Sequence, residues 1–85
     1  MKKIIRTNQP SVTQMTNMAE NLREESGKAV SVNAVCWAFN ITPHTPPKFQ
    51  IYVEYNGTNY YDSWPELLNG YFSLLSDLSK EAEND

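Results

Sequence analysis

Few residues in this chain are capable of nucleophilic chemistry. It holds one cysteine, Cys36, and one histidine, His44. Cys36 stands among small apolar residues in a predicted strand, where a thiol usually serves as packing. His44 lies between prolines in a predicted loop, where a histidine is usually solvated. We therefore expect no enzymatic activity, and these two residues are the only nucleophile–base pair that could contradict this expectation.

Acidic residues have a spacing compatible with metal binding at two places. Glu20 and Glu24, and again Asp77 and Glu81, stand four residues apart in predicted helices. This spacing puts both carboxylates on one side of a helix, but solvated helix faces carry such pairs routinely. A single cysteine excludes a multi-cysteine zinc site, and the three glycines are too widely spaced for a phosphate-binding loop. We expect neither a metal nor a cofactor.

Aromatic residues are the more informative candidates. Eight of the ten aromatic residues lie between Trp37 and Trp64. Tyr52 and Tyr61 are predicted to be cross-strand neighbours on the polar face of a hairpin, and Trp37 joins them if the register of the preceding strand allows it. An exposed tyrosine pair in polar surroundings is typical of a protein-binding surface, or of a platform for stacked bases. The alternative is that the first helix or another subunit covers this face.

The hairpin that positions these tyrosines is predicted from Asn56 and Gly57. Residues 49–55 alternate between apolar and polar, and residues 58–62 form the returning strand. A two-residue type I′ turn at Asn56 and Gly57 is favoured because both central positions need positive φ. That turn pairs Tyr52 with Tyr61. Its predicted apolar face comprises Phe49, Ile51, Val53, Tyr55 and Tyr60.

Residues 29–41 are predicted to form the first strand. Both of its faces become apolar from Ala34 onward. This pattern predicts either a central strand with two covered faces or a bulge near Asn33 and Ala34. The proline-rich residues 42–47 form a loop.

The first helix is predicted over residues 11–26. Ser11 and Gln14 have the spacing of a capping box, and Gly27 suits the left-handed position after the last turn. The polar side of this helix, which includes Asn21, is expected to face solvent. Its apolar stripe comprises Val12, Met15, Met18, Ala19 and Leu22.

The last helix is predicted from residue 63 to about residue 81. Ser63 and Glu66 again have capping-box spacing. Gly70 interrupts a stripe of leucines and aromatic residues, and we expect it to mark a close contact with the sheet. An alanine at a helical position is favoured over glycine by about 1 kcal/mol, so a glycine there needs a reason.

The element order helix, strand, strand, strand, helix predicts a single α+β domain over residues 1–85. Its three-stranded antiparallel sheet packs with two helices. Residues 1–10 are expected to be a basic arm or a short edge strand, and residues 80–85 a frayed acidic tail. A fourth strand from residues 2–6, or a sheet completed by a second subunit, are alternatives.

The same order occurs in double-stranded RNA-binding domains. Such domains place a lysine cluster at the start of the last helix, where it grips phosphates. This chain has Asp62 and Glu66 at that position. The required charge is absent, so we do not assign the chain to that family.

Composition narrows the class of function. The chain of 85 residues has 7 basic and 10 acidic residues, a net charge of −3. No apolar run approaches the roughly 20 residues of a membrane span, no secretory signal is apparent, and the single cysteine suits a reducing cytoplasm. We therefore expect a small non-catalytic cytoplasmic protein-binding module with a protein partner. The profile is shared by accessory proteins of phages and mobile elements, including inhibitors that occupy a basic site on a host protein.

Two other functions remain open from the sequence. One is nucleic-acid binding through Lys2, Lys3 and Arg6 with the tyrosine face, although the acidic balance disfavours it. The other is an obligate homo-oligomer, a homodimer for example, in which the aromatic face is a subunit interface.

Overall fold

The structure is a computed structural model that describes residues 1–35 and 48–83. The predictions on Cys36, Trp37 and His44 lie outside the described residues. The predicted α+β class and element order are confirmed: α1 (Val12–Ser26), β1 (Val30–Val35), β2 (Lys48–Val53), β3 (Gly57–Tyr61) and α2 (Trp64–Glu83). The last helix therefore continues beyond the predicted end near residue 81, into the segment expected to fray.

Helix α1 begins and ends as its capping residues predict. The Ser11 hydroxyl accepts a hydrogen bond from the Gln14 backbone N–H at 3.3 Å, and Gly27 adopts φ 67° while its N–H bonds the Arg23 carbonyl. In α2, the Ser63 hydroxyl accepts from the Glu66 N–H at 3.4 Å, and the Glu66 carboxylate accepts from the Asp62 N–H. The two serine bonds satisfy backbone donors that a helix leaves free at its first turn, and the Gly27 bond satisfies a carbonyl of the last turn of α1.

The sheet is antiparallel throughout, with strand order β1–β2–β3. The central strand is therefore β2, and the predicted central position of the first strand is wrong. Pairing from Val30 to Val35 is continuous, so no bulge occurs at Asn33 and Ala34. The Arg23 guanidinium donates to the Val30 carbonyl at 2.9 and 3.1 Å. Arg23 thus satisfies a backbone carbonyl of β1, an edge strand. Unsatisfied backbone groups on an edge strand could otherwise pair with a strand of another chain.

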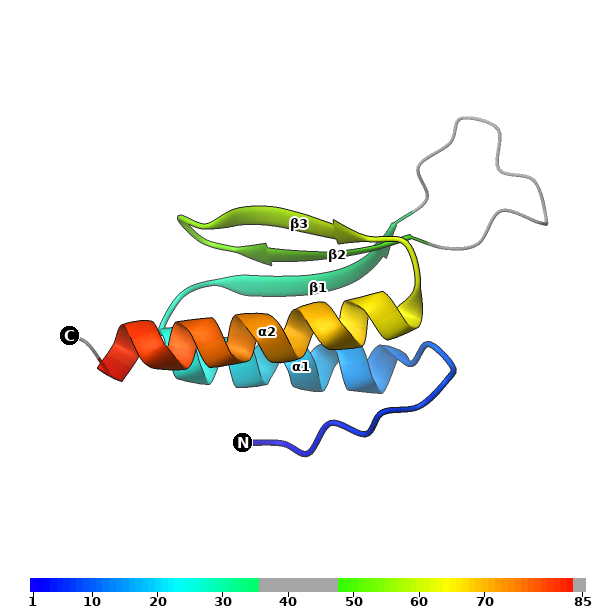
Figure 1. The fold of residues 1–85 in the computed structure, drawn as a ribbon, viewed down its shortest axis with the longest axis horizontal. Coiled ribbons are helices and arrows are strands. Elements are labelled where there is room, and N and C mark those ends of the chain that lie inside the picture. The colour runs from blue at the N-terminus through cyan, green and yellow to red at the C-terminus, as the bar shows by residue number, and fades with distance from the viewer. Residues whose placement is uncertain (36–47, 84–85) are drawn as a thin grey trace.

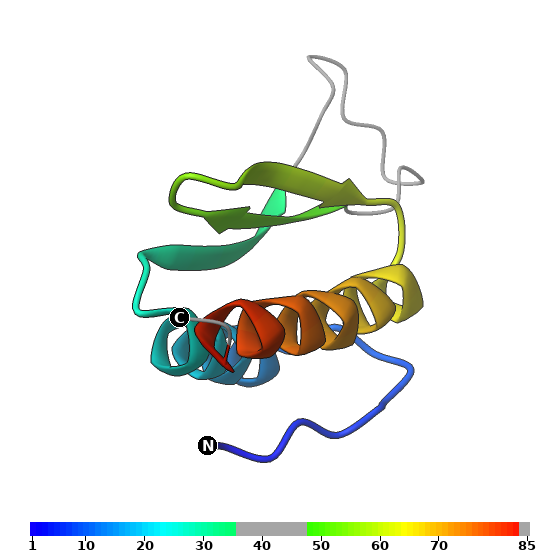
Figure 2. The ribbon, with the colours of Figure 1, turned by 60° about the vertical axis from the view of Figure 1, so that its left-hand side comes forward.

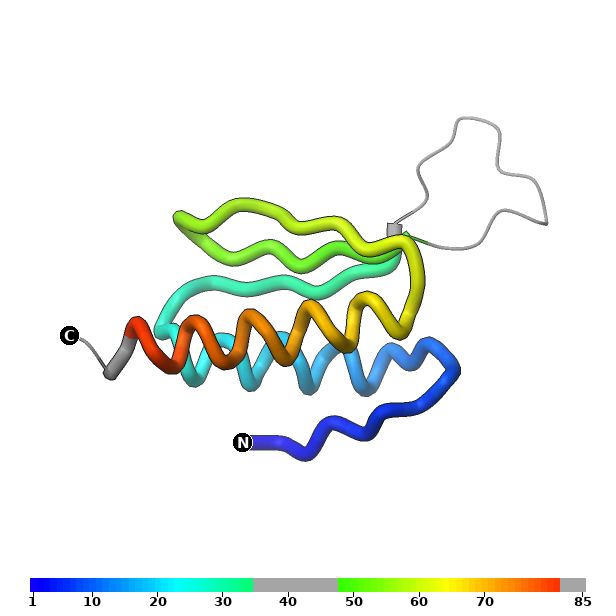
Figure 3. Tube along the Cα trace, in the orientation of Figure 1, coloured from blue at the N-terminus to red at the C-terminus, as the bar shows by residue number. Residues whose placement is uncertain are grey.

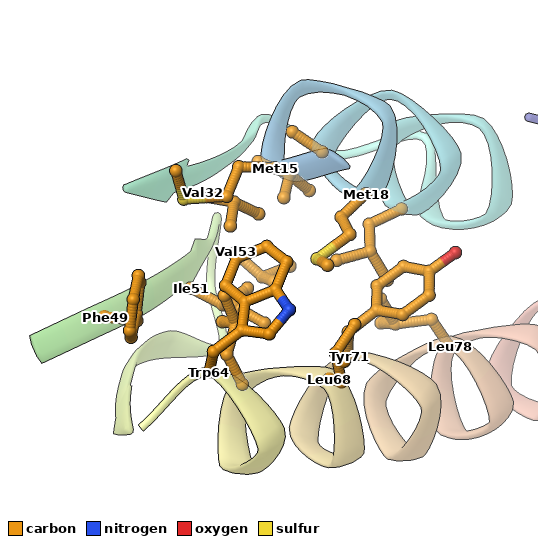
Figure 4. Packing of buried hydrophobic residues seen from close by; sticks show 14 residues of the cluster. Met15, Met18, Val32, Phe49, Ile51, Val53, Trp64, Leu68, Tyr71 and Leu78 are labelled. Atoms are coloured by element: carbon orange, nitrogen blue, oxygen red, sulfur yellow. The ribbon is translucent and has the colours of Figure 1, made fainter. Parts of the chain in front are cut away.

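Both helices cover the same face of this sheet. They lie side by side and run in the same direction, with the sheet on one side of them (Figures 1 and 2). Val30, Val32, Phe49, Ile51 and Val53 face the helices from the sheet. Figure 4 shows these side chains meeting those of the two helices in one core. The helical members of the core are Met15, Met18, Ala19, Leu22, Trp64, Leu67, Leu68, Tyr71 and Leu78.

Residues 1–10 form no strand. They run along the helix pair on the side away from the sheet and then fold back into α1 (Figures 1 and 3). Of the alternatives for this segment, the short edge strand, or fourth strand, over residues 2–6 is therefore wrong. Ile4 packs against the edge of the core. The arm is an extended layer over the helices.

Asn21 is buried, contrary to the sequence expectation. Only 1% of its surface is exposed. Its carboxamide accepts from the Lys2 N–H at 2.8 Å and donates to the Lys2 carbonyl at 2.7 Å and to the Tyr71 hydroxyl at 3.0 Å. A buried amide is tolerated only when its polar atoms are bonded. The arm supplies two of these bonds, and so the flank of α1 that carries Asn21 is covered.

The predicted close contact at Gly70 is confirmed. A Cβ atom at this position would overlap the ring of Tyr61. The ring lies over the helix backbone, where only glycine leaves room.

We expect Gly70→Ala to lower the free energy of unfolding by about 1 kcal/mol or more, because the Tyr61 ring must be displaced. In a Tyr61→Ala background the same change should instead stabilise the protein by up to about 1 kcal/mol, through helix propensity. A double-mutant cycle in urea measures both effects. Equal stabilisation in the two backgrounds would contradict the close contact.

Candidate protein-binding face

The face of the sheet opposite the helices is the candidate site. Among the described residues, both helices lie on the other face (Figures 1 and 2). We call this surface the outer face. By register, it includes Ser31, Asn33, Lys48, Gln50, Tyr52, Thr58 and Tyr60.

Two tyrosines occupy the middle of the outer face. Tyr52 pairs with Ser31 and Thr58, and Tyr60 pairs with Gln50. Tyr52 and Tyr60 are therefore diagonal neighbours across β2 and β3, a relation within reach of aromatic side chains. They are 40% and 56% exposed. Lys48 is the one formally charged residue of these seven, and it pairs with Asp62.

The predicted pairing of Tyr52 with Tyr61 is wrong. Val53 pairs with Gly57 and Tyr52 with Thr58, so the loop contains Glu54, Tyr55 and Asn56. The Asn56 N–H bonds the Val53 carbonyl at 3.0 Å, and Tyr55 takes φ 70°. The change of register is odd, so Tyr60 and Tyr61 exchange faces.

The physical reason for this register lies at the far end of the hairpin. The predicted two-residue turn would have set Asp62 opposite Ile51, on the face covered by the helices. The observed register turns Asp62 outward, where it forms an ion pair with Lys48. It also sets Tyr61 beside Phe49, over Gly70.

Of the three predicted site residues, the structure places only Tyr52 on the outer face. Tyr61 is on the helix side, and Trp37 is outside the described residues. Tyr60 was assigned to the apolar face from the sequence and belongs to the outer one. Two features of the sequence could have indicated that Tyr60 lies on the outer face. One is the need to keep Asp62 out of the core, and the other is Gly70, which leaves room for an aromatic ring from β3 against α2.

Burial changes the acid–base behaviour of the tyrosines on the helix side. It raises the pKa of the Tyr61 phenol above 10.0. Burial also raises the pKa of Tyr71, opposed by the hydrogen bond from Asn21 and reinforced by the negative charge of Glu25. Both phenols stay neutral in the folded protein where an unfolded tyrosine begins to ionise.

The basic arm is engaged within the fold. Lys2 pairs with Glu20 at 2.7 Å, and the terminal amine lies 3.7 Å from Glu24. The Arg6 guanidinium lies 4.5 Å from the centre of the Phe72 ring. These cations sit on the side of the helices opposite the outer face, so they do not combine with its tyrosines to form one nucleic-acid surface.

The carboxylate pairs also have internal partners. Glu20 and Glu24 pair with the arm, and Glu81 lies 3.8 Å from Lys28. Within residues 1–35 and 48–83, no three histidine, cysteine or acidic side chains form a group that could hold a metal ion. In the same residues no helix combines the length and apolar character needed to cross a membrane.

No family model, curated protein or solved structure matches this chain. The candidate site therefore stands on its own geometry.

Serine substitutions distinguish the two faces. We expect Tyr52→Ser to change the free energy of unfolding by less than about 0.5 kcal/mol, because its ring faces solvent. Tyr61→Ser should cost about 1–3 kcal/mol, because it removes a ring packed between the sheet and α2. Urea unfolding of the two variants measures the difference. Equal costs would contradict the assignment of faces.

Stability should fall as the pH rises above 10. Tyr61 and Tyr71 have a raised pKa in the folded state, so above pH 10 the unfolded chain has lost more protons than the folded one. The resulting slope of the unfolding free energy against pH is negative there and vanishes well below pH 10. Urea titrations between pH 8 and about pH 11.5 measure it. A Tyr61→Phe/Tyr71→Phe variant should show a shallower decline, and an unchanged slope would contradict the assignment.

Proposed function

We propose that this chain is a small, non-catalytic cytoplasmic module that binds a protein partner through the outer face of its sheet. The observation that carries the proposal is a surface with two central tyrosines that both helices leave uncovered, on which Lys48 is paired with Asp62. Cores of protein interfaces are depleted of charged residues and enriched in tyrosine. The surrounding serine, asparagine, glutamine and threonine side chains supply adaptable hydrogen bonds, as in antibody paratopes.

The charges near this face favour a protein over a nucleic acid. Proteins that stack bases on aromatic rings also supply cations for the phosphates. Lys48, the cation on the outer face in the strand register, pairs with Asp62. A phosphate backbone laid over the tyrosines would therefore meet a neutralised charge.

The size of the outer face limits the strength of binding. Three strands spaced about 4.8 Å apart, each about 20 Å long, give a face of roughly 300 Å². A standard interface buries about 800 Å² on each partner. The outer face alone is thus smaller than a standard interface, which suits weak, reversible association.

The test is differential capture with matched tyrosine variants. The wild-type chain and Tyr55→Ser are used to capture proteins from a lysate of the native cells, beside a Tyr52→Ser/Tyr60→Ser variant. Tyr55 is the control because it is 88% exposed but lies in the hairpin turn. We expect one protein, retained by wild type and Tyr55→Ser after nuclease treatment, to be lost from the double variant.

Two results would overturn the proposal. Capture that disappears with nuclease would indicate nucleic-acid binding. Capture that is equal for the wild type and the double variant would show that the outer face is not the binding surface. Light scattering of the purified chain is the accompanying control, since a stable dimer disrupted by the double variant would make the outer face a subunit interface.

A further inference from the structure

The arm over the helices is bound in the manner of an extended peptide. We call residues 1–6 the strap, and we call the residues beneath it the strap seat, which comprises Glu20, Asn21 and Glu24 of α1 with Asn69 and Phe72 of α2. The strap runs antiparallel to α1: Lys2 lies at Asn21, and the Ile5 carbonyl accepts from the Gln14 side chain at 3.5 Å. Three extended residues span about 10 Å, the same length as seven helical residues.

Alternate strap residues face the seat. Lys2 pairs with Glu20, Ile4 packs against the core, and Arg6 lies over Phe72 and donates to Asn69 at 3.0 Å. Ile4 is half-buried, whereas its neighbours Lys3 and Ile5 are exposed, Ile5 by 54%. This period of two is that of an extended peptide, whose alternate side chains are read by the surface beneath.

Asn21 binds the backbone of the strap and not its side chains. Its carboxamide bonds both the N–H and the C=O of Lys2, at 2.8 and 2.7 Å. A neighbouring β-strand would satisfy an extended residue with the same donor and acceptor. The seat thus combines a backbone contact with an acidic end for a lysine, an apolar contact, and an aromatic ring for an arginine.

We propose that the strap seat is a second protein-binding site, and that the strap is its intramolecular occupant. The external occupant is an extended peptide with lysine, an aliphatic residue and arginine at alternate positions. Charge complementarity supports this choice, because Glu20 and Glu24 meet the basic end of the bound segment. The strap's two ion pairs are exposed and, like its one cation–π contact, individually weak. The backbone of an incoming peptide can remake the two hydrogen bonds to Asn21, which makes displacement feasible. The seat lies on the opposite side of the molecule from the outer face and is independent of it.

The test uses the chain of 85 residues and a labelled peptide with the sequence of residues 1–10. A tethered strap competes at a local concentration on the order of millimolar, so the wild-type chain should bind this peptide poorly. Ile4→Asp places a charge against the core and should release the strap. Fluorescence anisotropy should then show peptide binding at least about tenfold tighter than for wild type.

Matched controls separate displacement from general damage. Ile5→Asp makes the same change on the exposed side of the strap and should bind the peptide as poorly as wild type does. A peptide carrying the Ile4→Asp change should bind neither chain. A peptide of serines with only the alternating lysine, valine and arginine should bind the released chain. If it does not bind, the proposed external occupant is overturned.

A second releasing variant keeps the proposal open to refutation if Ile4→Asp does not fold. Arg6→Glu acts at the exposed part of the strap and leaves the core intact. Failure of both variants to fold would show that the strap is an inseparable part of the structure, and would overturn the proposal. So would a folded variant with an unprotected Lys2 amide, measured by hydrogen exchange, that binds no peptide at millimolar concentration. A wild-type dimer formed by strap exchange would make a second copy the occupant instead.

Discussion

The carboxamide of Asn21 is the contact on which the arrangement of the helix side depends. It is buried, so its donor and acceptor must be bonded within the protein. The Lys2 peptide supplies one acceptor and the donor, and the Tyr71 hydroxyl supplies the second acceptor. A single side chain therefore joins the strap, α1 and α2. Replacing it with an apolar residue would leave the Tyr71 hydroxyl and a strap peptide without these partners, at about 1–3 kcal/mol for each buried group.

A second constraint, between Gly70 and Tyr61, determines what the sheet shows to solvent. Because the Tyr61 ring lies where a Cβ would be, β3 can approach α2 only with this residue turned inward. The strict alternation of a strand then turns Tyr60 outward. The composition of the outer face thus follows from a packing contact on the opposite face. By the same alternation Asp62 is turned outward, where it forms an ion pair with Lys48.

The local elements could be predicted from the sequence, because their signals are local. Ser11, Gly27 and Ser63 mark helix ends through bonds to residues at most four positions away, and the leucine stripe of α2 needs only a helical period. The role of Gly70 was also predictable, since a glycine in an apolar stripe suggests a neighbour. The hairpin register was not predictable from Asn56 and Gly57 alone. The free energy gained from the preferred turn is small compared with the cost of burying the Asp62 carboxylate. That cost arises only because α2 and α1 cover one face of the sheet.

Asn21 shows the same limit on the helix side. At 100° per residue it lies roughly 120° from the centre of the apolar stripe of α1, where solvent is the normal surrounding. It is buried because a segment nearly twenty positions earlier crosses it. No periodicity within α1 contains that information. The same holds for Lys2 and Arg6, whose charges indicate an external polyanion until Glu20 and Phe72 are seen beside them.

The distribution of charge unites the two surfaces. Lys2, Lys28, Lys48 and the terminal amine each lie within 4 Å of a carboxylate in the structure. Three of these four pairs lie at the helices or the strap, and the fourth lies at the end of the outer face. The tyrosine centre of the outer face is left neutral, so its discrimination among partners depends on shape and hydrogen bonds. The strap seat, in contrast, pairs the carboxylates of Glu20 and Glu24 with the basic end of the bound segment. The affinity of the strap seat should therefore be more sensitive to salt than that of the outer face.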